Sequence, residues 1–188
     1  PKSFQDKSPI NIAMTKIYSI LNDYKDMLFH LEKIIKSGNF LPYNLCNYGY
    51  WRCFDKSWSQ DKFFEYGKFV DNSLIKYPED QLIKLTSKKN KKINLGILSA
   101  DLNSGHAITY FLKTILLNYN KEDIEIYLFS NQTNDNNIST KITDLVHKTT
   151  NISKLSELRA LNKIREFNLD VMIDVMGYTS KNRIGLYK

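Results

Sequence analysis

The second half of the chain alternates short apolar runs with segments of helical periodicity, and this alternation limits the possible folds more than any other feature. Runs with the length of strands occupy residues 93–98, 124–129, 149–152 and 169–175. Helical patterns occupy residues 107–117 and 139–147, and a third one starts at Ser153 or Ser156 and runs through Phe167. Strands that alternate with helices indicate a parallel sheet, and nearly continuous apolar strands indicate burial on both faces. The sequence therefore predicts the α/β class, with a Rossmann-like parallel sheet over residues 93–188.

The first third of the chain is instead predicted to be helical. Ser8 and Pro9 form a start signal, and apolar residues then recur at helical spacing as far as Gly38, which predicts one helix ending there. Further helices are predicted at residues 43–55 and 60–76, with their aromatic side chains packed between helices. We therefore predict a helical segment over residues 1–80, made of linker helices or a degenerate repeat, and a charged connector over residues 81–92.

The composition is that of a globular protein and argues against several functions. The hydrophobic content of 42% is sufficient for a core, no apolar run is long enough to cross a bilayer, and the first residues of the given sequence show no signal-peptide pattern. The net charge is +7, but Lys far outnumbers Arg, and the one dense basic run lies in the predicted connector. A nucleic-acid surface would instead combine Arg and Lys with aromatics on one face. We therefore expect neither nucleic acid nor membrane as a partner.

The two cysteines, Cys46 and Cys53, lie in one predicted helix and give no zinc signature. At this spacing they are predicted to share a helix face as buried free thiols, with a local disulfide as the alternative. Free thiols are typical of a reducing compartment, which predicts a cytoplasmic protein.

The polar loops after the first and last predicted strands hold the side chains best suited to chemistry. Neither a dinucleotide-binding GxGxxG nor a P-loop follows the first strand, and the nucleophile motif GxSxG is absent. In a doubly wound sheet both loops open at the same edge, where ligands bind. A histidine oriented by a carboxylate could transfer a proton there. The candidates are Ser99, Asp101 and His106 in the first loop, and Asp174, Gly177, Tyr178, Thr179, Asn182 and Arg183 in the second.

Structural roles compete with these assignments. His106 begins a predicted helix and also suits a helix N-terminus. Asp101 and Asp174 are typical turn or cap residues. Arg183 could be a surface cation that pairs with a helix end.

Together these segments resemble the amino-terminal half of the catalytic region of the O-linked N-acetylglucosamine transferase and SPINDLY-like family, glycosyltransferase family forty-one. The similar segments are INLGILSADLNSGHAITYFL, IEIYLFSN, the NIS-helix element and LDVMIDVMGYTSKNR, which cover about residues 91–186. Family members have Ser-x-Asp, then His, then Tyr-Phe or His-Phe in the first segment, and Gly-His-Thr or Gly-Tyr-Thr followed by Asn-Arg in the last. Between Asp101 and His106 this chain carries one residue more than the family pattern.

The resemblance implies a GT-B architecture, in which two Rossmann-like halves enclose the active site and this chain supplies the acceptor-side half. It implies an inverting, metal-independent enzyme that transfers a sugar, commonly N-acetylglucosamine, from a nucleotide sugar such as UDP-N-acetylglucosamine to protein side chains. No cofactor is implied. His106 would match the active-site histidine, with Asp101 as its loop partner, and both would be catalytic. The residues that would bind substrate are Ser99, Gly177, Tyr178, Thr179, Asn182 and Arg183.

In this family the donor-binding half lies downstream. We therefore expect a fragment whose partners are an acceptor protein or peptide and a missing carboxyl-terminal donor-binding domain, and which transfers no sugar alone. Two alternatives remain open. One is a non-catalytic protein-binding module built on the aromatic-rich helices. The other is a different enzyme on a flavodoxin-like or response-regulator-like sheet, with Asp101 in an acidic pocket.

Overall fold

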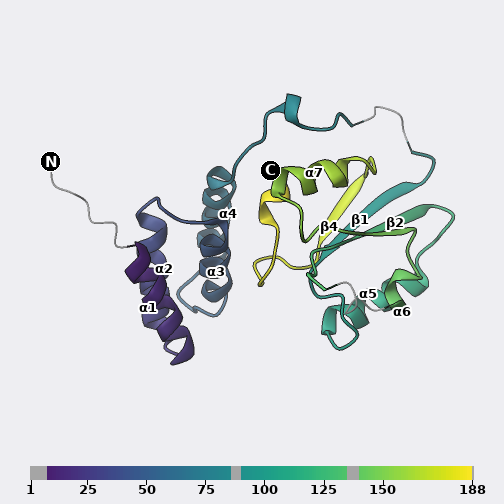
Figure 1. The fold of residues 1–188 in the computed structure, drawn as a ribbon. Coiled ribbons are helices and arrows are strands. Elements are labelled where there is room, and N and C mark those ends of the chain that lie inside the picture. Colours follow the sequence, from purple (N-terminus) through teal and green to yellow (C-terminus); the bar gives the residue numbers. More distant parts are fainter. Residues whose placement is uncertain (1–7, 86–89, 135–139, 188) are drawn as a thin grey trace. The chain divides into compact units, whose positions relative to one another are not determined.

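The computed structural model describes residues 8–85, 90–134 and 140–187. Packing divides the chain into two units, drawn in Figure 1. The helical unit comprises the described part of Pro1–Ile75 together with Tyr178–Ser180. The α/β unit comprises the described parts of Lys76–Gly177 and Lys181–Lys188.

The described part of the helical unit consists of α1 (Ser8–Ile20), α2 (Tyr24–Lys36), α3 (Pro42–Arg52) and α4 (Gln60–Ser73). Each helix packs against the next one along the chain. Buried apolar side chains of the last three helices form the core, namely Met27, Leu31, Ile34, Leu45 and Val70. The buried Tyr66 hydroxyl donates to the Leu45 carbonyl at 2.6 Å and links α4 to α3.

The prediction of one helix from Ser8 to Gly38 is wrong, because the chain turns between α1 and α2. Asn22 adopts a φ of 56°, in the left-handed region that asparagine tolerates better than most residues. Asp23 then accepts a hydrogen bond from the Asp26 N–H and caps α2. This local cap satisfies a backbone donor and starts a new helix.

The predictions for Cys53 and for the aromatics of α4 are partly wrong. Cys46 is buried as predicted, but Cys53 is exposed because it follows the last residue of α3. Both cysteines are free thiols. Phe64 and Phe69 of α4 are exposed rather than packed inward.

The α/β unit contains a sheet of four strands in the order β3-β2-β1-β4. The strands are β1 (Ile93–Ser99), β2 (Ile124–Ser130), β3 (Lys148–Asn151) and β4 (Val171–Asp174). All three pairings are parallel, which confirms the predicted class and sheet. At the centre, Ile97 of β1 is in register with Leu128 of β2 and Ile173 of β4.

Helices cover both faces of this sheet (Figure 1). One face carries α5 (Ala107–Asn118) and α6 (Thr140–Thr143), and the other carries α7 (Glu157–Arg165) and the 3-10 turn η3 (Ile184–Tyr187). Because side chains alternate along a strand, neighbouring residues serve different layers. Ile97 and Leu128 belong to the α5 layer, whereas Leu98 and Phe129 belong to the α7 layer.

Residues at both described ends of the predicted connector bond to the α/β unit. After the short turn η1 (Glu79–Gln81), the Asn162 side chain accepts the Ile83 N–H and donates to the Gln81 carbonyl, both at 2.8 Å. Arg165 donates to the Ile83 carbonyl at 2.7 Å. Further along, the Asn90 side chain donates to the Asn168 carbonyl at 2.9 Å.

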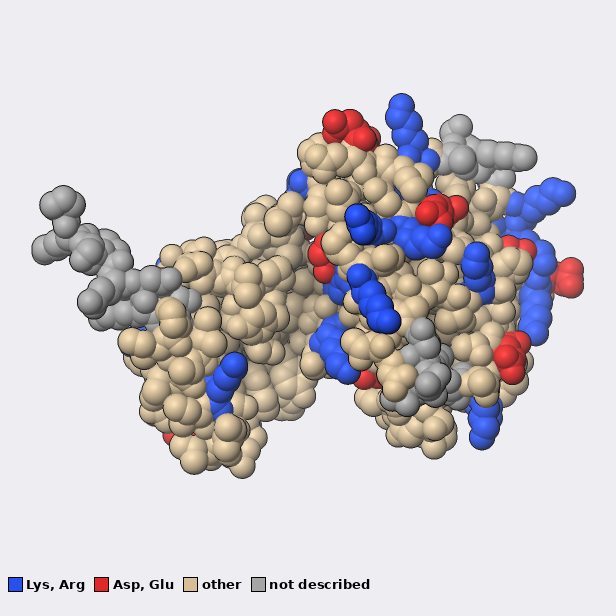
Figure 2. All heavy atoms as spheres, in the orientation of Figure 1, with Lys and Arg blue, Asp and Glu red and all other residues tan. Residues whose placement is uncertain are grey.

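Charged residues are spread over the α/β unit. Figure 2 shows Lys and Arg over the visible face of this unit, with Asp and Glu between them.

Within the described residues, no helix is both long enough and apolar enough to span a bilayer.

Candidate functional site

The carboxyl ends of β1 and β4 lie side by side at one edge of the sheet. Leu98 is in register with Asp174, and the Val175 N–H donates to the Leu98 carbonyl at 3.2 Å. The two loops singled out in the sequence therefore leave the sheet from adjacent strands. In open α/β sheets this edge is the usual location of ligands.

Hydrogen bonds hold the loop after β1 in one conformation. The fully buried Ser99 hydroxyl accepts the Asp101 N–H at 3.1 Å. Thr109, buried in the first turn of α5, donates its hydroxyl to the Asn103 carbonyl at 2.7 Å and lies 3.1 Å from the Asp101 carbonyl. The backbone position of Asp101 is therefore fixed from both the strand and the helix.

His106 closes this loop as the N-cap of α5. Its backbone is extended, with φ −88° and ψ 139°, and its Nδ1 accepts the Ile108 N–H at 3.3 Å. Its Nε2 lies 3.9 Å from Oδ2 of Asp101. The side chains are 46% and 32% exposed, respectively. The helix-terminal role that the sequence allowed for His106 is confirmed, and the outer nitrogen of the ring stays accessible beside a carboxylate.

Asp174 organises the loop after β4. Its carboxylate accepts the Met176 N–H at 2.9 Å and the Gly177 N–H at 3.1 Å, which confirms the turn role allowed by the sequence. Gly177 needs its lack of a side chain here, because its φ is +54°. Burial raises the pKa of the Asp174 carboxyl, and the two backbone hydrogen bonds oppose this shift.

Arg183 is engaged by several groups of the α/β unit. Its Nε donates to Glu157 at 2.7 Å, and Nη1 donates to the side chain of Asn131 at 3.1 Å and to the carbonyl of Ile152 at 3.2 Å. Its Nη2 donates to the carbonyl of Leu155 at 3.1 Å, and the side chain is only 10% exposed. Glu157 opens α7, so Arg183 does pair with a helix end, but from a largely buried position.

Asn131 is a residue of this edge that the sequence reasoning missed. It directly follows β2 and is buried, and its amide donates to the Lys181 carbonyl at 2.7 Å while its oxygen accepts from Arg183. The available signal was the same as for Ser99 and Asp174, namely a polar side chain at the end of an apolar strand.

The other predicted site residues fall into two groups. Asn182 accepts the Ile184 N–H at 3.3 Å and so caps η3 within the α/β unit. Tyr178 and Thr179 are grouped with the helical unit. Of the predicted site residues, the structure brings Ser99, Asp101 and His106 together at the loop after β1.

Among the described residues, no group of three or more His, Cys, Asp or Glu side chains is placed to hold a metal ion.

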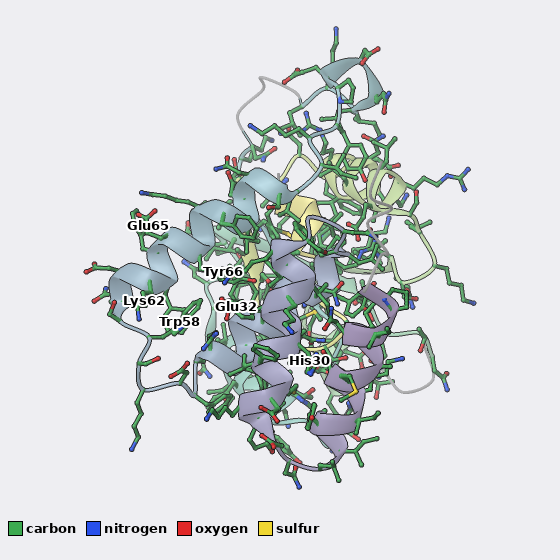
Figure 3. All side chains as sticks on the ribbon, turned by 90° about the vertical axis from the view of Figure 1, so that its left-hand side faces the viewer. His30, Glu32, Trp58, Lys62, Glu65 and Tyr66 are labelled. Atoms are coloured by element: carbon green, nitrogen blue, oxygen red, sulfur yellow. The ribbon has the colours of Figure 1, made fainter. Side chains whose placement is uncertain are left out.

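Two hollows flank the ion pair between Glu32 and Arg52 in the helical unit. The first has a volume of about 630 Å³ and is largely aromatic, with Tyr24, Phe29, Trp51 and Phe54 in its lining. The second has a volume of about 560 Å³, and Figure 3 shows Glu32, Trp58, Lys62, Glu65 and Tyr66 around it. Arg52 forms the wall between them, since its guanidinium lies 3.2 Å from Glu32 and 5.2 Å from the centre of the Trp58 ring.

No protein-family model matches this chain, and no curated protein matches its sequence. Among solved structures, it is similar to a point mutant of the O-GlcNAc transferase of Thermobaculum terrenum, with a TM-score of 0.77 at 10% sequence identity. The match covers 96% of this chain and 35% of that chain, so this chain spans about a third of the length of its structural neighbour. The chain therefore has a glycosyltransferase-like α/β fold.

Proposed function

We propose that this chain is the acceptor-side part of a protein O-glycosyltransferase. The enzyme transfers a sugar, with N-acetylglucosamine as the first choice, from a nucleotide sugar to hydroxyl side chains of an acceptor protein or peptide. Transfer inverts the anomeric carbon and requires neither a metal ion nor a cofactor. His106 and Asp101 act on the reacting groups. The acceptor side of the cleft is shaped by Ser99, Gly177, Tyr178, Thr179, Asn182 and Arg183.

The observation that carries this proposal is the position of the two loops that resemble the family motifs. They follow adjacent parallel strands at the ligand-binding edge of a glycosyltransferase-like sheet. One of them presents an accessible histidine beside a carboxylate, which is a suitable pair for proton transfer or charge stabilisation.

We further propose that polypeptide downstream of Lys188 supplies the donor-binding domain and that the whole enzyme is cytoplasmic. The greater length of the structural neighbour supports a second domain. A lone acceptor side lacks preorganised groups to stabilise the departing nucleotide diphosphate. The 188-residue chain alone is therefore proposed to be inactive.

A transfer assay tests this function. The reading frame is expected to continue into a second Rossmann-like unit. The full-length protein is expected to transfer labelled N-acetylglucosamine from UDP-N-acetylglucosamine to peptides that contain Ser and Thr. His106→Ala is expected to lower turnover about 100-fold, because a positioned acid–base or donor group contributes at least that much. His30→Ala is the matched control, since His30 lies in the helical unit (Figure 3) and contacts Asn11. Robust transfer by the 188-residue chain alone, or unchanged turnover of His106→Ala, would contradict the proposal.

A second candidate function, partner binding by the helical unit, is favoured by exposed aromatic side chains. Phe29 and Phe54 are 52% and 68% exposed, and both line the larger hollow. Exposed aromatics beside a hollow are common anchors of protein interfaces. The double variant Phe29→Ser, Phe54→Ser is expected to lower partner capture from a lysate of the source cell at least tenfold. Phe111→Ser is the control, because Phe111 is also 68% exposed but lies in the α/β unit. Equal capture by both variants would argue against this function.

A further inference from the structure

The N-cap of α5 fixes the tautomer of His106. A backbone N–H can only donate, so the Nδ1 atom that receives the Ile108 N–H at 3.3 Å must present its lone pair. In a neutral imidazole the other nitrogen then carries the proton. Nε2 of neutral His106 is therefore a donor, and the one lone pair of the ring is already used inside the loop.

The Asp101 carboxylate places an acceptor beside this donor. Its Oδ2 lies 3.9 Å from Nε2, which is too long for a direct hydrogen bond. A single oxygen atom can nevertheless lie about 2.8 Å from both atoms at once. A donor and an acceptor at this spacing match a hydroxyl group, which accepts one hydrogen bond and donates another. A carboxylate ligand would be repelled by Asp101, and an ammonium group would find no acceptor on His106.

The pair is also held in place before any ligand arrives. Asp101 is fixed through its backbone N–H by Ser99 and through its carbonyl by Thr109. His106 is fixed through its ring by the Ile108 N–H and through its backbone N–H by the Asn103 carbonyl at 3.2 Å. Preorganised groups of this kind do not have to reorient when charge develops.

We propose that His106 and Asp101 together bind one hydroxyl group, with Asp101 as its proton acceptor and His106 as its hydrogen-bond donor. The identity of this group as the acceptor hydroxyl of sugar transfer rests on the proposed function. In that reaction the hydroxyl oxygen bonds to the anomeric carbon of the nucleotide sugar. The bond from that carbon to the phosphate oxygen breaks, and the nucleotide diphosphate leaves with its electron pair. The hydroxyl proton passes to Asp101, while the Nε2 proton stays on His106, whose hydrogen bond holds the hydroxyl oxygen in position for attack.

Nitrogen-15 NMR of the 188-residue chain tests the donor role without any transfer reaction. The chain is labelled at its histidines, and spectra are recorded in alkaline buffer that neutralises imidazole groups. His106 is expected to show a protonated Nε2 and an unprotonated Nδ1, and His106→Asn assigns its signals while retaining a capping oxygen. A proton on Nδ1, or an even mixture of both tautomers, would overturn the proposal.

The pH dependence of transfer by the full-length protein tests the proton acceptor. Asp101→Asn is expected to lower kcat at least 100-fold and to abolish the acidic limb of the kcat profile, with the acceptor KM little changed. His106→Gln, whose amide N–H can replace part of the Nε2 contact, is expected to retain the acidic limb and more activity than His106→Ala. If the limb instead persists in Asp101→Asn and vanishes in His106→Gln, His106 is the base and the proposal is wrong. If the wild-type protein transfers no sugar, the proposed function is wrong. The donor role of His106 is then tested by the NMR spectrum alone.

Discussion

Replacing Arg183 with alanine is expected to destabilise the α/β unit by about 3 kcal/mol, because several hydrogen bonds disappear together. The carbonyls of Ile152 and Leu155 lose a charged donor, and so do the side chains of Asn131 and Glu157. Each buried acceptor left without a partner costs about 1–3 kcal/mol, and water can satisfy only those near the surface. Arg183→Lys is expected to regain a minor part of the loss, since one ammonium group cannot reach all four acceptors.

Amide hydrogen exchange is the suitable measurement for this loss. Both tryptophans, Trp51 and Trp58, lie in the helical unit, so tryptophan fluorescence does not report directly on the sheet. Protection of the β1 and β2 amides from exchange is expected to fall in Arg183→Ala. The control is Lys154→Ala, which removes an exposed cation before α7. In this control the free energy of opening of the same amides is expected to stay within about 0.5 kcal/mol of wild type. Unchanged protection in Arg183→Ala would contradict its structural role and leave substrate contact as its main contribution.

Replacing Phe129 with alanine is expected to cost the α/β unit about 3–5 kcal/mol, which is the usual range for removing a buried aromatic ring. Phe129 is fully buried on β2 in the α7 layer, where its ring meets that of Phe167 edge-on at a centroid distance of 5.3 Å. The cavity left behind is bounded by the sheet and by α7, so it can collapse only partly. Urea denaturation followed by far-UV circular dichroism and by exchange of the β2 amides measures the effect.

The matched control for Phe129 is Phe111, a phenylalanine of the same unit that points into solvent. Phe111→Ala is expected to change the free energy of unfolding by less than about 0.5 kcal/mol. Phe129→Leu keeps most of the apolar volume and is expected to cost less than about 1.5 kcal/mol. Similar losses for Phe129→Ala and Phe111→Ala would contradict the assignment of Phe129 to the core.

The sheet was predictable from the sequence because its strands are buried on both faces. Burial makes segments such as residues 124–129 almost continuously apolar, and the helical patterns between them require parallel crossovers. The break between α1 and α2 was not predicted, since Leu21 and Tyr24 continue the helical spacing across it. Only the pair Asn22–Asp23 marks the turn, through a left-handed residue followed by a cap.

The candidate site was predictable only where it depends on local sequence. Asp101 and His106 lie five residues apart, and the helix that starts after His106 determines their approach. The partners of Arg183 come from residues 131–157, and no local pattern connects them with position 183. Asn131 could be recognised from the sequence as a polar residue that follows a strand. Its partners Lys181 and Arg183 could not be predicted, because they lie about 50 residues away along the chain.

The bonds between residues 81–83 and α7 determine where the α/β unit can be cut from the rest of the chain. A polypeptide that begins at β1 would lose the backbone partners of Asn162 and Arg165 and expose the α7 surface that this segment covers. Separate expression of the sheet should therefore start near Lys76, and after a protease nick behind residue 83 the amino-terminal fragment should stay attached to α7 through these bonds.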